Sequence, residues 1–203
     1  MSSYRLILAS SSRYRRDMLA RLRLPFEVAS PDVDETPLPD EAPDTLALRL
    51  SLAKARAVAA ARPGALVIGA DQVATVDGRS VGKPGTHERA IEQLRMLSGK
   101  EVAFHSAMTV TDGVRHDTVD VVTRCVFRTL SDADIQAYLV AETPYDTAGS
   151  AKAEGLGIAL MEEMVSDDPT AIIGLPLIAL SRLLRGFGVD PITGAGLAPG
   201  SAS

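Results

Sequence analysis

The residues of this chain best suited to chemistry are carboxylates and cations that border apolar runs or lie in glycine- and proline-rich turns. Asp71 follows the apolar run LVIGA, and Lys83 lies twelve residues later in the turn GKPG. Glu35 lies in the acidic, proline-rich segment SPDVDETPLPDEAP. Hard carboxylate oxygens suit Mg²⁺, and ammonium groups suit phosphate oxygens. This mixture of residue types predicts a metal-assisted site for a triphosphate.

A second group of cations lies where a helix is expected to begin. Three serines at 10–12 precede a first turn that carries Arg13, Arg15 and Arg16, although acidic side chains are usual at that place. The free N–H groups and partial positive charge of a helix N-terminus bind anions, so these arginines are explained if an anion completes the site. A solvated basic face on an ordinary helix is the alternative.

Several other kinds of site are not supported by the sequence. The histidines His87, His105 and His116 have no ligand-like spacing, so no zinc site is expected. The single cysteine, Cys125, lies within an expected strand and is interpreted as a core residue. No dinucleotide or phosphate-loop glycine motif is present. A net charge of −5 and a pI near 5.2 argue against long nucleic acids as partners.

Size and composition predict a single domain that works in the cytoplasm. The chain has 203 residues, of which 46% are hydrophobic, and this is enough for a substantial core. No apolar stretch approaches the roughly 20 residues that span a bilayer, and the start lacks a signal-peptide layout, so no membrane association is expected. A lone cysteine agrees with a reducing compartment. The domain is expected at 1–188 and a flexible C-terminal tail at 189–203.

Hydrophobic periodicity predicts strands that alternate with helices, together with two hairpins. Strands are expected at 5–9, 25–30, 66–70, 101–111 and 114–129, with a hairpin over 72–81 that turns at Asp77-Gly78 and a final strand in AGSAKAEGLGIAL. Helices are expected at about 13–24, 44–61, 86–99, 131–141 and 174–188. The first strand of the central pair is expected to end at Asp71, and Asp44 is expected to cap the second helix. The pattern indicates an α/β protein with a mixed β-sheet and flanking helices.

Long stretches of the chain resemble the Maf family of nucleoside triphosphate pyrophosphatases. The segments are LILASSSRYRRDML, VDET, LRLSLAKA, IGADQVATVDGRSVGKPGTHERAIEQLRMLSG and YDTAGSAKAEGLGIALMEEMVSDDPTAIIGLPLIALSRLL. The resemblance runs from about residue 5 to 188. It implies the fold of inosine triphosphate pyrophosphatases (Maf/Ham1), with two lobes around a cleft, and hydrolysis of a nucleoside triphosphate to the monophosphate and pyrophosphate. A homodimer is a further expectation from the resemblance.

The family's functional residues can be carried over by position. Its active-site residues fall on Ser10, Arg15, Glu35, Lys54, Asp71 and Lys83, and its specificity positions fall on Tyr14, Gln72 and Glu154. We expect Glu35 and Asp71 to bind a divalent cation, Mg²⁺ or Mn²⁺, while Arg15, Lys54 and Lys83 hold the triphosphate. Asp71 is expected to act as general base, metal ligand or both. The chain departs from the family at Arg13, where proline is usual.

Within the family, the chain resembles the branch that acts on 7-methyl-GTP. The resemblance lies in Gln72 after Asp71 and in the segments AGSAKAEGLGIAL and DDPTAIIGLPLIAL. A base with a positive charge and an acidic N1–H also suits the carboxylate of Glu154 and the aromatic face of Tyr14. Two alternatives stay open, a dTTP or UTP pyrophosphatase of the same family and a non-enzymatic nucleotide-binding regulator of septum formation.

Overall fold

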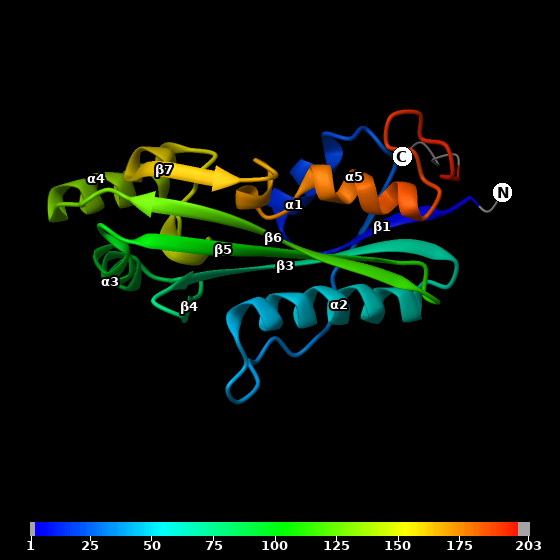
Figure 1. The fold of residues 1–203 in the computed structure, drawn as a ribbon, viewed down its shortest axis with the longest axis horizontal. Coiled ribbons are helices and arrows are strands. Elements are labelled where there is room, and N and C mark those ends of the chain that lie inside the picture. The colour runs from blue at the N-terminus through cyan, green and yellow to red at the C-terminus, as the bar shows by residue number, and fades with distance from the viewer. Residues whose placement is uncertain (1–2, 199–203) are drawn as a thin grey trace.

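A seven-stranded mixed sheet runs through the molecule and carries helices on both faces (Figure 1). The computed structural model describes residues 3–198. The strands are β1 (Arg5–Ala9), β2 (Glu27–Ala29), β3 (Ala65–Val76), β4 (Arg79–Val81), β5 (Glu101–Thr111), β6 (His116–Phe127) and β7 (Met161–Ser166). The helices are α1 (Arg13–Ala20), α2 (Pro43–Ala61), α3 (His87–Leu97), α4 (Asp132–Glu142) and α5 (Leu177–Gly186). In the described part of the chain, no helix is both long enough and apolar enough to cross a bilayer.

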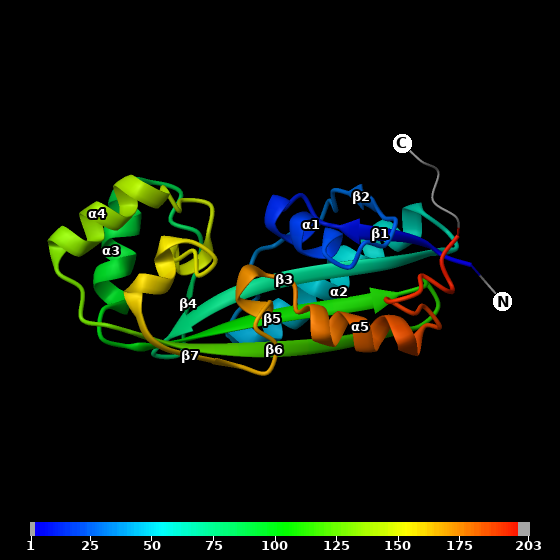
Figure 2. The same cartoon turned by 90° about the horizontal axis from the view of Figure 1, so that it is seen from above.

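The strand order is β2-β1-β3-β5-β6-β7. Strand β4 lies off this path and pairs with β3, which also pairs with β1. The pairs β1–β2 and β1–β3 are parallel, and the remaining pairs are antiparallel. This confirms the α/β class with a mixed sheet. Helix α2 covers one face, and α1 and α5 cover the other (Figure 1). Helices α3 and α4 lie together at the far end of the long strands (Figure 2).

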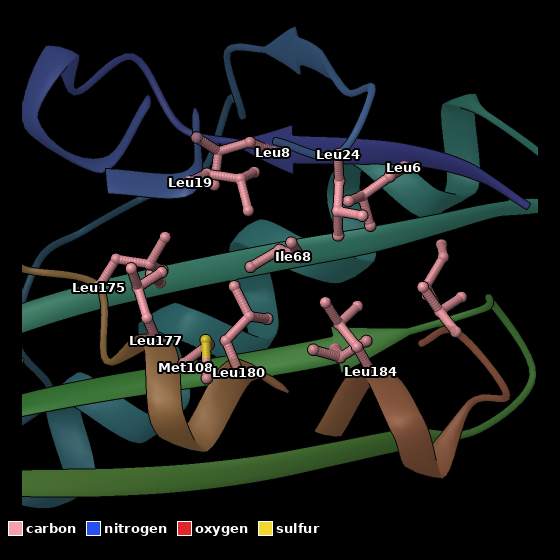
Figure 3. Packing of buried hydrophobic residues seen from close by; sticks show 14 of the residues in the cluster. Leu6, Leu8, Leu19, Leu24, Ile68, Met108, Leu175, Leu177, Leu180 and Leu184 are labelled. Carbon is pink, nitrogen blue, oxygen red and sulfur yellow. The ribbon is translucent and has the colours of Figure 1, made fainter. Parts of the chain in front are cut away.

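The largest hydrophobic cluster lies between the sheet and helices α1 and α5. Leu8 of β1 and Leu19 of α1 point toward Leu180 of α5 across Ile68 of β3, and all four side chains are fully buried (Figure 3). Burying one such side chain stabilises the fold by about 1.5–3 kcal/mol. A second cluster packs α3 and α4 against the other ends of β3, β5 and β6 around Phe104. The long strands therefore join two separately packed regions.

The opposite face of β3 is in unusually close contact with α2 at Gly69. A Cβ built at this glycine would overlap the carbonyl oxygen of Ser51 and would lie 2.6 Å from the backbone nitrogen of Ala55. The Ser51 hydroxyl also lies 2.9 Å from the Thr109 hydroxyl of β5. The missing side chain lets the helix approach the sheet, and Lys54 lies on this same turn of the helix.

Several local predictions differ from the structure. The first helix ends at Ala20 rather than at 24, and the segment 148–160, expected to hold the last strand, forms two short 3-10 helices, with β7 following at Met161–Ser166. Strand β3 does not end at Asp71 but continues to Val76, because β5 pairs with it without interruption from Val67 to Thr75. Asp44 is not the cap of α2: Ala42 holds that position without a side-chain bond, and Asp44 lies in the first turn after Pro43. Proline at this position fixes φ and needs no N–H partner, so the helix begins there without a polar cap.

Other local predictions are confirmed. Asp77 and Gly78 have positive φ values of 51° and 73° in the turn between β3 and β4, as a hairpin of this type requires. The Thr86 side chain caps α3 by accepting from the Arg89 N–H. Ser131 and Asp134 form the capping box of α4. In each case neighbours in the sequence decide the geometry.

The first part of the expected C-terminal tail lies against the N-terminal strand. Val189 is fully buried. The Tyr4 N–H donates to the Gly196 carbonyl at 2.9 Å, and the Ala198 N–H donates to the Tyr4 carbonyl at 2.8 Å. Residues 199–203 of that expected tail lie outside the described residues.

The acidic, proline-rich segment before α2 is an irregular loop held by one ion pair. The Arg49 guanidinium donates to the Glu41 carboxylate at 2.6 Å and 2.8 Å, and it also donates to the Thr36 carbonyl at 3.1 Å. The hydrogen bond from Arg49 lowers the pKa of Glu41 from 4.5 to about 2. This anchor orders the loop that carries Glu35.

We predict that Gly69→Ala destabilises the protein by about 2 kcal/mol or more, because the new methyl group meets backbone atoms that cannot move aside. The measurement is the free energy of unfolding in urea. Gly82→Ala is the matched control, because a Cβ there meets nothing within 4 Å. Equal stability of the two variants would contradict the close contact between α2 and β3.

We predict that Glu41→Gln removes a pH-dependent part of the stability. Because the pKa of Glu41 is lowered from 4.5 to about 2 in the folded protein, its stabilising effect is complete above pH 4.5 and is lost as the pH falls toward 2. The wild type should therefore exceed Glu41→Gln in unfolding free energy at pH 7, and the difference should shrink on acidification. A difference independent of pH would argue against the ion pair. Glu162→Gln, at an exposed position of β7, serves as control.

Candidate active site

The candidate site lies at a gap in the sheet beside β3. Strand β1 pairs with β3 only as far as Gly69, and β4 pairs with it only from Ala74 onward. Between these two partners, the edge of β3 at Asp71 and Gln72 is left open. The segment after β1 leads into α1, and the segment after β4 leads into the Lys83 turn. Both segments therefore border the gap.

A cavity of about 600 Å³ opens at this gap. Eight of the nine predicted site residues line it: Ser10, Tyr14, Arg15, Glu35, Lys54, Asp71, Gln72 and Lys83. The ninth, Glu154, lines a smaller adjoining space of about 80 Å³ that shares Tyr14, Arg15, Gln72 and Lys83 with the larger one. The structure therefore brings all nine residues together, although they come from six separate parts of the chain.

A buried ammonium group is the electrostatic centre of the larger cavity. Lys54 of α2 is 5% exposed, and its Nζ lies 2.7 Å from Asp71 Oδ1 and 2.8 Å from Glu35 Oε1. Asp71 is itself only 7% exposed, whereas the side chain of Glu35 is more than half exposed. A buried charge is tolerated when it is paired and hydrogen-bonded. Asp71 is thus the fixed partner of Lys54, and Glu35 is the partner that faces solvent.

Arg15 is the cation nearest to this pair on the α1 side. Its Nε donates to the Gly174 carbonyl at 3.1 Å. Burial lowers the pKa of Arg15, and the carboxylates of Asp71 and Glu35 act in the opposite direction. Among the described residues, its terminal guanidinium nitrogens have no hydrogen-bond acceptor. They are therefore available to an anionic ligand in the cavity.

The serines before α1 shape the start of that helix. The Ser12 hydroxyl accepts from the Arg15 N–H at 3.4 Å and caps the helix. The Ser10 hydroxyl accepts from the Ser12 N–H at 3.1 Å, and Ser10 is 3% exposed. Because the first turn has no acidic residue, its positive end meets the cavity without a compensating carboxylate of its own.

Asp71 and Gln72 are neighbours in sequence but belong to opposite faces of the sheet. Asp71 points to Lys54 on the α2 face. The Gln72 amide nitrogen donates on the other face to Ser106 Oγ at 3.0 Å and to the carbonyl oxygens of Ala171 and Ile172 at 3.1 Å each. Since those carbonyls can only accept, the amide orientation is fixed. The Gln72 oxygen is left as the acceptor of this side chain.

Lys83 is exposed at the opposite wall of the cavity and is held by the segment that follows α4. The Gly85 N–H donates to the Tyr145 carbonyl at 3.0 Å, and the Gly149 N–H donates to the Gly82 carbonyl at 3.3 Å. These bonds grip the turn on both sides of Lys83. The turn and the segment 145–149 therefore form one structural unit.

Asp146 is a site residue that the sequence reasoning missed. It lines both cavities, and its carboxylate accepts from the Tyr14 hydroxyl. Arg13 donates to the same hydroxyl at 2.9 Å and lies 4.8 Å from the centre of the Tyr14 ring. The segment YDTAGS belongs to the quoted resemblance, but nothing in its local pattern singled out the aspartate.

The carboxylates of the cavity can be tested as ligands of a divalent cation. No group of three or more His, Cys, Asp or Glu side chains within residues 3–198 is arranged to hold a metal ion. Glu35 and Asp71 nevertheless converge on the same Lys54 Nζ from separate elements. Mg²⁺ is commonly bound by one or two carboxylates together with substrate phosphates. The donor set therefore fits an ion that arrives with a phosphorylated substrate.

Comparisons with known proteins place this chain in a family. A protein of Bordetella pertussis named 7-methyl-GTP pyrophosphatase is 73% identical over 190 residues, which cover 94% of this chain and 96% of the relative. Proteins of the same name from Bordetella avium and Burkholderia pseudomallei are 71% and 62% identical, over 93% and 94% of this chain and 95% and 91% of their own lengths. A family model described as Maf-like protein matches residues 5–187, and the chain belongs to the Maf family.

Proposed function

We propose that this protein is a pyrophosphatase that hydrolyses 7-methyl-GTP to 7-methyl-GMP and pyrophosphate and so removes a modified nucleotide from the pool. The observation that carries the proposal is the buried Lys54 between Asp71 and Glu35, in one cavity with Arg15 and Lys83. The relatives named above, at 62–73% identity over most of the chain, support the choice of nucleotide.

The larger cavity suits the triphosphate. Its four cations, Arg13, Arg15, Lys54 and Lys83, outnumber its three carboxylates, Glu35, Asp71 and Asp146, by one positive charge. A bound divalent ion would raise this surplus to three, which approaches the charge of a nucleoside triphosphate. Charge neutralisation by preorganised groups is the main source of rate in phosphoryl chemistry. The arrangement therefore favours phosphates at the gap beside β3.

Asp71 and Glu35 are the residues that would hold Mg²⁺ or Mn²⁺. When bound, such an ion would add positive charge against the substrate's phosphates. Glu35 is suited to this role because its loop exposes it to solvent, so it can exchange Lys54 for a ligand. Asp71 is suited because the strand and Lys54 fix its position before substrate arrives.

The proposed reaction is attack of water on the α-phosphorus with release of pyrophosphate. Lys54 holds one oxygen of Asp71 at 2.7 Å, so the second oxygen can orient the attacking water and accept its proton. The bond between the α-phosphorus and the bridging oxygen breaks, and the electron pair leaves with pyrophosphate. Lys83 and Arg15 stabilise the charge that develops on this leaving group. The rest of the rate enhancement comes from holding the water in line with the bond that breaks at the α-phosphorus.

The smaller cavity suits the nucleobase. Tyr14 offers an aromatic ring, and Glu154 offers a carboxylate that can accept from the Watson–Crick edge of guanine. The fixed amide of Gln72 leaves its oxygen as a further acceptor. We infer that the α1–α2–α5 region and the α3–α4 region act as the two lobes of an inosine triphosphate pyrophosphatase-like fold, with the nucleotide between them. The cytoplasmic location and the homodimer stay predictions.

The first test is a panel of nucleoside triphosphates assayed for pyrophosphate release with and without Mg²⁺. We expect metal-dependent release from 7-methyl-GTP, with kcat/KM above those of GTP, dTTP and UTP. Faster release from dTTP or UTP would favour the pyrimidine branch of the family. No release from any nucleotide, with binding retained, would favour the non-enzymatic regulator.

We predict that Asp71→Asn lowers kcat by on the order of 10² or more, because an amide can neither accept a proton nor balance the charge of Lys54. The measurement is the steady-state rate of pyrophosphate release from 7-methyl-GTP. Asp167→Asn, at an exposed position outside both cavities, makes the same chemical change and should leave the rate unchanged. Near-normal turnover of Asp71→Asn would rule out both the base and the metal-ligand role.

A further inference from the structure

A direct polar contact crosses the candidate active site between Tyr14 and Asp146. The Tyr14 hydroxyl lies 3.2 Å from Asp146 Oδ2 and 3.3 Å from Oδ1. Tyr14 belongs to α1, whereas Asp146 lies in the segment after α4, 132 positions later in the chain. The contact therefore links the wall that carries Arg15 to the wall that carries Lys83.

The two ends of this contact are fixed differently. Asp146 belongs to the unit 145–149, which is tied to the Lys83 turn on both sides. Tyr14 lies in the first turn of α1, whose start is capped by Ser12. The Tyr14 hydroxyl also accepts from Arg13 at 2.9 Å. Its only donor hydrogen therefore goes to Asp146, and the carboxylate is held at the hydroxyl end of the ring.

The two cavities border Tyr14 in different ways. Tyr14 and Asp146 line both of them, whereas Arg13 lines only the larger and Glu154 only the smaller. The Arg13 guanidinium, which lies 4.8 Å from the ring centre, is thus on the side of the phosphates. The smaller cavity is lined by Tyr14 and by two carboxylates, Asp146 and Glu154. A nucleobase that enters this cavity therefore lies near both negative charges.

We propose that Asp146 is a specificity-determining residue of the nucleobase subsite, where its negative charge, held in place by the Tyr14 hydroxyl, favours a cationic purine over its neutral counterpart. The inference rests on the proposed function and assigns a second carboxylate to base selection. Methylation at N7 gives guanine a formal positive charge, while the phosphates of 7-methyl-GTP and GTP are the same. A carboxylate beside the base therefore separates the two nucleotides by charge, and an aromatic ring adds to this by cation–π attraction.

The test uses Asp146→Asn and the ratio of kcat/KM for 7-methyl-GTP over GTP. An asparagine oxygen can still accept from the Tyr14 hydroxyl, so the variant removes the charge and keeps the contact. Because Asp146 is exposed, we expect the ratio to fall by about two- to fivefold, the upper range of a solvent-screened charge interaction. A merely structural role would lower both kcat/KM values together. An unchanged ratio would overturn the inference.

A binding measurement gives the same comparison without turnover. The dissociation constants of 7-methyl-GMP and GMP, measured by calorimetry in the absence of metal, should differ less for Asp146→Asn than for the wild type. Asp167→Asn removes one negative charge outside both cavities and should keep the wild-type difference. Loss of preference in Asp167→Asn as well would mean that net charge, rather than Asp146, sets the selectivity, and would overturn the inference.

Tyr14→Phe keeps the test decisive even if Asp146→Asn does not fold. This variant retains the ring but removes the donor that holds Asp146, so the preference for 7-methyl-GMP over GMP should fall here too. In the double variant the preference should fall no further than in Asp146→Asn, because the hydroxyl acts through the carboxylate. An undiminished preference in Tyr14→Phe, or additive losses in the double variant, would contradict the proposed link.

The outcomes separate this inference from the proposed function. A wild type that does not prefer 7-methyl-GTP to GTP defeats the proposed function and the inference together. A wild type that has the preference, combined with an Asp146→Asn variant that keeps it, defeats only the inference. The preference present in the wild type and reduced in Asp146→Asn supports both.

Discussion

The ammonium group of Lys54, buried between Asp71 and Glu35, is the interaction on which the rest of the site depends. An unpaired charge at this depth would be strongly unfavourable, so the lysine and its two carboxylates must be brought together by the same fold that buries them. Helix α2 supplies the lysine, and its close approach to β3 at Gly69 sets the distance to Asp71. The approach removes water from one carboxylate, while the other stays in reach of solvent. That difference gives one fixed and one exchangeable acid in a single site.

The gap in the sheet decides where the chemistry can occur. A long central strand normally has both edges covered, but β1 and β4 each pair with only part of one edge of β3. The uncovered part carries Asp71 and Gln72, whose side chains alternate between the faces. One of them therefore meets Lys54 on the α2 face, and the other bonds to Ser106 and to the carbonyls of Ala171 and Ile172 on the opposite face. The same gap admits the chain segments that carry Arg15 and Lys83, so a single topological feature gathers acids and cations around one cavity.

The two packed regions of the molecule contribute different parts of the site. The region around α1, α2 and α5 supplies the buried ion pair and Arg15, and the region around α3 and α4 supplies Lys83, Asp146 and the neighbourhood of Glu154. Each region has its own hydrophobic cluster, and the long strands join them. The contact between Tyr14 and Asp146 is a direct bond between these regions across the cavity. The segment 145–149 therefore holds both the Lys83 turn and the contact to Tyr14.

Features that depend on neighbours in the chain can be predicted from the amino-acid sequence. The Asp77-Gly78 turn, the caps at Thr86 and Ser131 and the mixed α/β pattern follow from local sterics and hydrogen bonds, and all are present. The resemblance also indicated nine residues that the structure brings to one place. The continuation of β3 through Asp71 depends on long-range pairing, since its ladder with β5 joins residues more than twenty positions apart. The tertiary structure alone brings Asp146 to Tyr14, because a contact across 132 positions leaves no periodic or local signal in the sequence.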